Sequence, residues 1–115
     1  MSINCQIHEN LKDCLRTKSI NSNLEVCGFI LNNEFVECKN IHPDPKNYFL
    51  ISPKDIPWDK LDDNTLLFHS HPEHATVDGF SKWDIENQFY FQLKMLLYSV
   101  KYNRFYFRDY LLKCL

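Results

Sequence analysis

The sequence predicts an α/β (α+β) domain in which a mixed β-sheet is flanked by helices. Two kinds of pattern alternate along the chain: short apolar runs of strand length and stretches with helical spacing or helix-start signals. This alternation is typical of helices packed on a sheet. The 115 residues and the 44% hydrophobic fraction suit one packed core, so we expect a single domain over residues 1–115.

The first third of the chain contains a helix signal followed by a hairpin signal. Four residues recur there at helical spacing, namely Ile7, Leu11, Cys14 and Leu15. Residues 24–31 are almost all apolar, as in a buried strand, and residues 34–38 alternate, as in a returning strand. Asn32 and Asn33 lie between them and predict a tight hairpin turn, because Asn tolerates positive φ.

The middle of the chain predicts a strand at residues 48–51 and then a helix. Ser52 is a candidate N-cap and Pro53 suits the first helical position. Residues 62–64 end this expected helix. Residues 66–68 then form a short, buried strand that leads directly into His69.

The last third predicts a loop, a helix and two strands. Residues 72–80 read as the loop, and Ser81 opens a helix that we expect to run to about residue 93. Residues 95–100 and 104–107 are the expected strands. We expect the aromatic residues of this region mainly to pack in the core, with some available for a partner, at Phe89, Tyr90, Phe91, Phe105, Tyr106 and Phe107.

Composition argues against several classes of protein. The net charge is −2 and the charges are interspersed, so we expect neither nucleic acid nor membrane as a partner. The first residues lack the pattern of a signal peptide, and no apolar run is long enough to span a bilayer. The five cysteines are odd in number and form no C-x-x-C pair, which favours a reduced, cytoplasmic chain with small buried thiols.

The segment His69-Ser70-His71-Pro72 is the first candidate for chemistry. Residues at i and i+2 of a strand point to the same side, so the two imidazoles can share one metal ion. Two histidines and a carboxylate with an open fourth position are typical of catalytic zinc. The competing interpretation is two polar side chains on a loop.

Asp84 and Glu25 are the candidate carboxylates. Asp84 lies in the first turn of the expected helix, where a carboxylate is favoured, although Ser81-x-x-Asp84 also fits a simple helix cap. Glu25 interrupts an apolar run, where burial of a carboxylate is costly. It is therefore either a general base near a metal-activated water or a solvated residue at the beginning of its strand.

These residues together resemble the JAMM (MPN+) zinc metalloproteases. The pattern of that family is a Glu on an early strand, then His-Ser/Thr-His-Pro, then Ser-x-x-Asp, matched here by Glu25, by residues 69–72 and by Ser81 with Asp84. The resemblance covers nearly the whole chain and is similar in look to small prokaryotic and phage tail-assembly members. It implies an MPN/JAB (cytidine-deaminase-like) fold.

The resemblance also implies roles for the matching residues. His69, His71 and Asp84 would bind Zn²⁺, and Glu25 would take a proton from the activated water and pass it to the leaving amine. Ser81 would hydrogen-bond the oxyanion. The implied activity is that of a peptidase or isopeptidase acting on a protein or peptide, in the cytoplasm of a cell or host, or in a virion if phage-encoded.

The loop before Asp84 departs from the family pattern. The family usually has ten residues between the second His and the Asp, whereas twelve lie between His71 and Asp84. The usual spacing falls on Lys82, which is no ligand, and His74 and Asp78 are rival donors within the loop. Only Asp84 keeps a Ser three residues before it, so Asp84 is the predicted ligand.

A non-catalytic assembly module, such as a phage tail protein that keeps the fold and the metal, is the alternative function. Relatives without activity usually lose ligands, and here all are present. A metal-dependent deaminase is a weaker alternative, because the sequence lacks the Pro-Cys-x-x-Cys signature. His8 and His42 are expected to be ordinary surface or loop residues.

Overall fold

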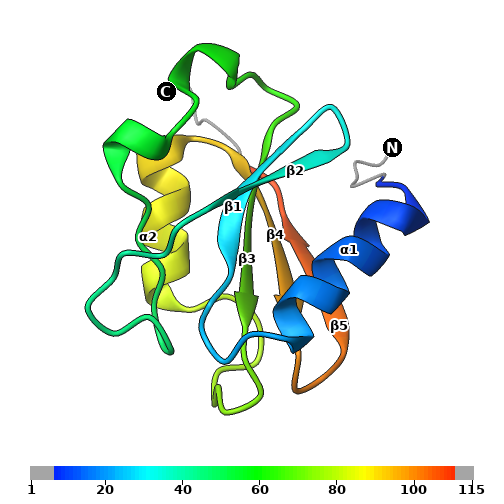
Figure 1. The fold of residues 1–115 in the computed structure, drawn as a ribbon. Coiled ribbons are helices and arrows are strands. Elements are labelled where there is room, and N and C mark those ends of the chain that lie inside the picture. The colour runs from blue at the N-terminus through cyan, green and yellow to red at the C-terminus, as the bar shows by residue number, and fades with distance from the viewer. Residues whose placement is uncertain (1–6, 111–115) are drawn as a thin grey trace.

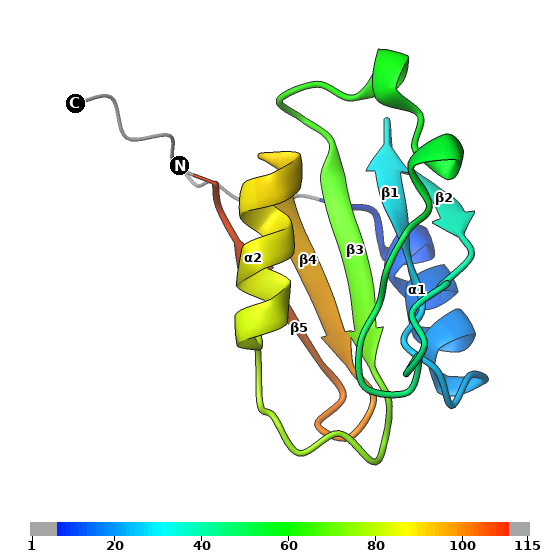
Figure 2. The same ribbon diagram turned by 90° about the vertical axis from the view of Figure 1, so that its left-hand side faces the viewer.

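Five strands form one mixed sheet in the computed structural model, which describes residues 7–110. Figure 1 labels the strands, and their spatial order, β2-β1-β3-β4-β5, can be followed from right to left in Figure 2. Their bounds are β1 Cys27–Leu31, β2 Glu34–Cys38, β3 Leu66–His71, β4 Lys94–Ser99 and β5 Arg104–Arg108. The β3–β4 pair is parallel and the other pairs are antiparallel. The predicted class, a mixed sheet flanked by helices, is confirmed.

The two helices cover opposite faces of the sheet. Figure 2 shows α1 (Glu9–Ile20) on one side and α2 (Lys82–Phe91) on the other. Alternating residues of β3 therefore serve two cores: Leu67 packs in the core on the α2 side, whereas Leu66 and Phe68 pack in the core on the α1 side. The α2-side core is the layer in which the candidate site lies.

The β1–β2 hairpin closes as the sequence predicts. Asn32 and Asn33 have φ of 51° and 64°, and Leu31 pairs with Glu34 across the two-residue turn. Gly28 lies opposite Glu37, and a Cβ at this position would lie 2.2 Å from the Val36 carbonyl oxygen. The hairpin therefore needs glycine at residue 28 because the neighbouring backbone leaves no room for a side chain.

The crossover from β3 through α2 to β4 places the start of α2 next to the end of β3. The helix ends at Gln92, which has a left-handed φ of 57° and donates its N–H to the Gln88 carbonyl at 2.7 Å. The side chain of Gln88 is buried and donates to the carbonyls of Leu93, Arg108 and Asp109. These bonds fix α2 against the sheet.

Two predictions for the middle of the chain, a strand at residues 48–51 and a helix after it, were wrong. Residues 48–51 form only one bridge, Asn40 with Ile51, because the Asn40 side chain bonds the Tyr48 carbonyl and the Leu50 N–H. Residues 52–61 form two short 3₁₀ turns, Pro53–Asp55 and Trp58–Lys60, instead of one helix. Ile56 precedes Pro57 and is extended, since a residue before proline is disfavoured in the helical region.

The cysteines and aromatic residues are only partly as expected. Cys27 and Cys38 are buried, but Cys14 is exposed; Cys5 and Cys114 lie outside the described residues. Phe91, Phe105 and Phe107 pack against the cores, whereas Phe89 and Tyr90 are 60% and 64% exposed on α2.

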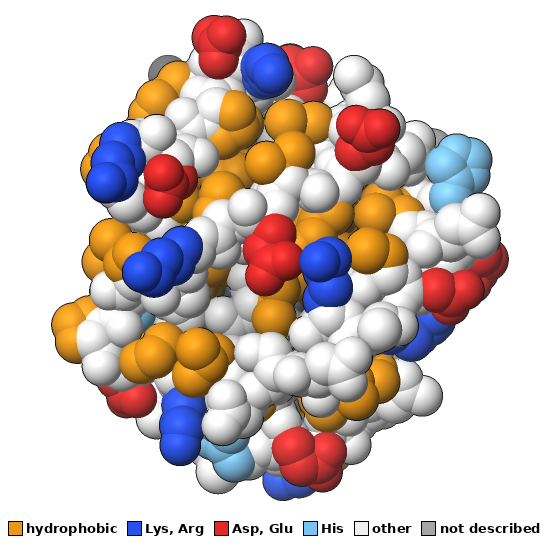
Figure 3. Space-filling view, viewed as in Figure 1, with side chains coloured by type: hydrophobic (Ala, Val, Ile, Leu, Met, Phe, Trp, Pro, Cys, Tyr) orange, Lys and Arg blue, Asp and Glu red, His pale blue; other side chains and the backbone are white. Residues whose placement is uncertain are grey.

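The surface carries both signs of charge. On the face shown in Figure 3, acidic and basic side chains are interspersed among apolar ones. Over residues 7–110, neither helix has the length and apolar character needed to cross a bilayer.

Candidate metal centre

The two histidines of β3 share its α2 side. His69 and His71 follow Leu67 at alternate positions, so all three leave the same face of the strand. Both side chains are buried: His69 is fully inaccessible and His71 is 3% exposed. The pair thus lies at the carboxyl end of a central strand and not on a loop.

Asp84 meets both histidines from the first turn of α2. Its Oδ2 atom lies 2.9 Å from His69 Nε2 and 3.1 Å from His71 Nε2. The same oxygen accepts the Ser81 N–H, while Ser81 Oγ accepts the Asp84 N–H, which forms a capping box. Both sequence interpretations of Asp84 therefore apply at once: it caps the helix and faces the histidines.

Glu25 approaches the histidines from the other side. It precedes β1, which begins at Cys27 and not at residue 24, yet its side chain is buried and not solvated. Glu25 Oε2 lies 3.9 Å from His71 Nε2. Its backbone is held on both sides, by its N–H to the Pro45 carbonyl and by Asn40 Nδ2 to its own carbonyl.

The four side chains fit a single cation. One donor atom from each of Glu25, His69, His71 and Asp84 lies within 4.8 Å of every other. Donor atoms bound to one tetrahedral zinc ion at about 2.0–2.2 Å lie about 3.3 Å apart, close to the two Asp84–His distances. Two carboxylates and two neutral imidazoles also balance the charge of one divalent ion.

Buried polar atoms without hydrogen-bond partners also support a cation among these four side chains. Within residues 7–110, four buried side-chain atoms lack a hydrogen-bond partner, and all belong to this cluster: Glu25 Oε1, His69 Nδ1, His69 Nε2 and His71 Nδ1. His69 Nε2 is near Asp84 Oδ2 but without hydrogen-bond geometry. Buried polar atoms are rarely left unpaired, so His69 Nε2 and Glu25 Oε1 support a cation between them, whereas the two Nδ1 atoms are the second ring nitrogens and point away from Nε2.

Burial and neighbouring charges shift the pKa values of Glu25 and Asp84 in opposite directions. Burial, with repulsion from Asp84 and Asp44, raises the pKa of Glu25 to about 9. Burial also acts to raise the pKa of Asp84, but attraction to the His69 and His71 imidazoles, with the hydrogen bond to His71, holds it well below its usual range. Asp84 is thus the ionised partner of the histidines, and Glu25 is the carboxyl that gains most from a nearby cation.

Aromatic packing orients the first histidine. The His69 ring stacks on Phe49 with centroids 4.7 Å apart, and Phe80 lies 6.3 Å away. Ligating histidines usually donate their second ring nitrogen to an oxygen, but within the described part of the chain neither Nδ1 has such a partner. Stacking therefore replaces hydrogen bonding as the feature that fixes the orientation of His69.

A pocket of about 220 Å³ gives access to the cluster. Glu25, His71 and Ser81 are among the residues that line it. The Ser81 oxygen accepts a backbone N–H, which leaves its hydroxyl hydrogen free to donate. The pocket thus exposes a carboxyl, an imidazole and a hydroxyl to whatever enters it.

The rival donors of the lengthened loop lie elsewhere. His74 Nε2 bonds the Lys46 carbonyl at 2.9 Å, and Asp78 accepts from the Tyr106 hydroxyl. Lys82 is exposed. Asp84 is therefore the acidic residue after His71 that the structure brings to the histidines.

Two further residues position the site and were missed by sequence reasoning. Ser70 bonds Val26 twice, since its Oγ accepts the Val26 N–H and its N–H donates to the Val26 carbonyl. Asn40 donates to the carbonyls of Glu25, Pro45 and Tyr48. Ser70 lies within the His-x-His motif and was a visible candidate, but nothing in the sequence distinguishes Asn40 from the other asparagines.

His42 and His8 are not part of the cluster. His42 Nδ1 accepts the Asp44 N–H, and its ring packs against Tyr48 and Trp83. His8 is exposed at the start of α1.

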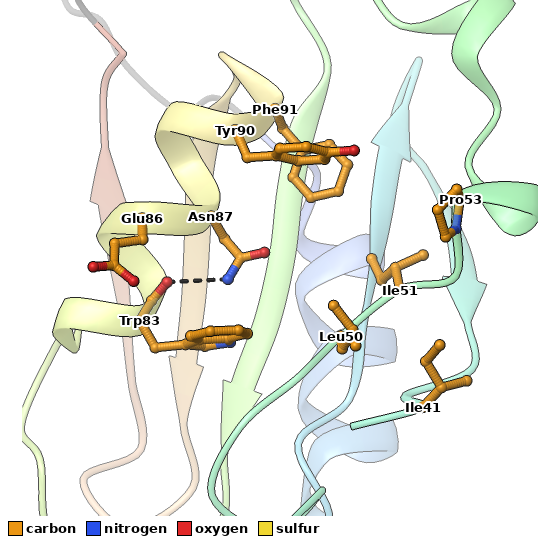
Figure 4. Close-up of a pocket in the computed structure, with 9 residues that line it drawn as sticks. All are labelled: Ile41, Leu50, Ile51, Pro53, Trp83, Glu86, Asn87, Tyr90 and Phe91. Carbon is orange, nitrogen blue, oxygen red and sulfur yellow. Dashed lines mark hydrogen bonds between the residues drawn. The ribbon is translucent and has the colours of Figure 1, made fainter. Parts of the chain in front are cut away.

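A second hollow, of about 310 Å³, is apolar and contains none of the four donors. Figure 4 shows Trp83, Tyr90 and Phe91 of α2 facing Leu50 and Ile51 across it. The Trp83 indole donates to the Phe49 carbonyl at 2.8 Å, which ties α2 to this segment. This hollow is a feature of α2 packing and not of the metal centre.

Comparison with known proteins adds no family assignment. No protein-family model matches the sequence, and the search of curated proteins found no match. The family resemblance therefore stays an expectation from the motif residues of the sequence.

Proposed function

We propose that this protein is a zinc-dependent peptidase or isopeptidase of the JAMM type, with an MPN/JAB fold. The observation that carries the proposal is the buried cluster of Glu25, His69, His71 and Asp84, of which Glu25 and His71 line an open pocket. The order of these residues along the chain supports it independently, because it is the order of the family motif.

His69, His71 and Asp84 are the proposed ligands, since Asp84 lies closest to both imidazoles. Bound there, zinc would lower the pKa of a water molecule and polarise the amide carbonyl. Glu25 stands farther off, at 3.9 Å from His71 Nε2, which suits a group that acts on the water.

The chain's own residues then carry the protons. Glu25 takes a proton from the water as the carbonyl carbon is attacked, and gives it to the amine as the C–N bond breaks. The free hydrogen of the Ser81 hydroxyl donates to the developing oxyanion. In the net reaction, one amide and one water molecule are converted to a carboxylic acid and an amine.

The alternative function is a non-catalytic assembly module that keeps the metal. The unpartnered Nδ1 atoms of both histidines favour it, because zinc enzymes depend on such second hydrogen bonds. We rank it second because Glu25 and Ser81, which a purely structural site does not need, both line the pocket.

Substitution of Glu25 by Gln tests the proposal. The zinc-loaded wild type is expected to hydrolyse members of a fluorogenic peptide library, and Glu25→Gln is expected to lower kcat by about 10²–10⁴ because the general base is lost. Metal analysis should show the same zinc content in both proteins. Glu34→Gln, on an exposed residue of β2, is the matched control.

Two results would overturn the proposal: no hydrolysis by the zinc-loaded wild type across the library, or equal hydrolysis by Glu25→Gln. The first result, together with retained zinc, would favour the assembly module.

A further inference from the structure

The loop between β3 and α2 is tied to two neighbouring segments. His74 Nε2 donates to the Lys46 carbonyl at 2.9 Å, and the Tyr106 hydroxyl of β5 donates to Asp78. Pro72 is buried at one end of the loop and Phe80 packs against the α2-side core at the other. The loop is thus held at both ends and at two points between them.

The residues between the two tethers face the metal pocket. Ala75, Thr76 and Val77 line it together with Asn47 and Tyr48 on the opposite segment. Lys46 immediately precedes Asn47, so the His74–Lys46 bond joins the two walls of the pocket directly. The His74–Lys46 bond thus links the loop to the segment that contributes Asn47 and Tyr48 to the pocket.

We propose that residues 75–77 are the specificity wall of the metal pocket, held by the His74–Lys46 and Asp78–Tyr106 bonds so that the site accepts a small, uncharged side chain beside the scissile amide. This inference rests on the proposed peptidase function.

The chemistry of the walls sets the substrate class. Apart from Glu25 and His71, the lining side chains are neutral: the apolar groups of Ala75 and Val77, the hydroxyls of Thr76 and Ser81, an amide and a tyrosine ring. A charged substrate side chain that packs on these neutral walls would lose water without gaining an opposite charge from them. The volume of about 220 Å³ also lies below the range of about 300–1,000 Å³ for drug-sized ligands, which disfavours large aromatic side chains.

Peptide binding to the zinc-loaded Glu25→Gln variant tests the wall without requiring hydrolysis. The probes are fluorescein-labelled Gly-Gly-X-Gly-Gly peptides in which X is Ala, Val, Lys, Glu or Trp, measured by fluorescence polarisation. We expect the Ala and Val peptides to bind at least about tenfold more tightly than the Lys, Glu and Trp peptides, the factor that one unpaired buried group costs.

Two further substitutions in this background test the tether and the wall. Tyr106→Phe removes only the hydroxyl that bonds Asp78. We expect the preference for the Ala and Val peptides over the other three to fall to about threefold or less, and hydrogen exchange at residues 74–79 to become faster. The zinc affinity should stay unchanged. Val77→Lys places a cation on the wall at a residue that is 44% exposed, and should improve binding of the Glu peptide about two- to fivefold. Tyr102→Phe, in the β4–β5 turn, is the control.

Equal binding of all five peptides, or unchanged exchange and preference in Tyr106→Phe, would overturn the inference. Failure of the wild type to hydrolyse any peptide would instead count against the proposed function, since the binding and exchange measurements do not depend on turnover.

Discussion

Asp84 caps α2 and is also a proposed zinc ligand, and these two roles can be separated experimentally. Asp84→Asn keeps an oxygen that can accept the Ser81 N–H but removes the charged ligand. We expect zinc affinity to fall by more than the roughly 10- to 100-fold that outer-shell partners contribute. The Tm of the metal-free protein should change by less than about 8 °C, equivalent to about 1 kcal/mol.

Isothermal titration with zinc and thermal unfolding with chelator measure these two quantities. Asp63→Asn, on an exposed turn residue, is the control. Unchanged zinc affinity in Asp84→Asn would show that Asp84 is only a cap.

Asn40 is expected to act on Glu25 through the backbone. Asn40→Ala leaves the carbonyls of Glu25, Pro45 and Tyr48 without this donor, so the free energy of unfolding should fall by about 1–3 kcal/mol. If the peptidase proposal holds, kcat should also fall while zinc content stays the same. Denaturant unfolding, metal analysis and kinetics check these points.

Asn64→Ala, at an exposed turn, is the control for Asn40→Ala. Unchanged stability in Asn40→Ala would contradict the positioning role.

The sequence was enough to predict that the two histidines share one side, because alternate residues of a strand point the same way. It was also enough to select Asp84, through its spacing from Ser81. It could not reach Asn40, whose partners are backbone atoms brought together by an irregular segment, and irregular conformations have no repeating pattern to read.

At the scale of elements, Gly28 decides whether the β1–β2 hairpin can close. Gly28→Ala should lower the free energy of unfolding by about 3 kcal/mol or more, because the added Cβ meets backbone atoms of β2 that cannot move without breaking the pairing. Gly79→Ala is the comparison: its φ is 92°, but a Cβ there has ordinary contacts, so strain alone should cost about 1–2 kcal/mol.

Denaturant unfolding of both variants measures the difference. Equal destabilisation by the two substitutions would show that the close approach to Val36 is not the limiting contact.

The elements were predictable where periodicity and turn chemistry agreed. The hairpin at Asn32 and Asn33 and the helix start at Ser81 are of this kind. Residues 48–61 were not, because side-chain bonds from Asn40 and the restriction before Pro57 outweigh the local propensities. Propensity is a weak guide where tertiary hydrogen bonds are available.

For the whole molecule, zinc is expected to stabilise the fold by joining β3 to α2. At a free zinc concentration 100 times its Kd, the free energy of unfolding should rise by about 2.7 kcal/mol. Chelator should reverse the rise. Thermal unfolding with and without zinc checks this, and magnesium is the control because nitrogen donors suit zinc better.

A zinc-independent Tm would contradict the metal centre.

The capping box at Ser81 and Asp84 has a consequence for metal supply. Because the helix start is closed by its own backbone and side chains, the chain does not need an ion to complete α2. If the site binds zinc as proposed, the start of α2 is therefore formed before the ion arrives, and loss of the ion does not by itself open it. Under metal starvation, such molecules would keep Asp84 in place to take up the ion again.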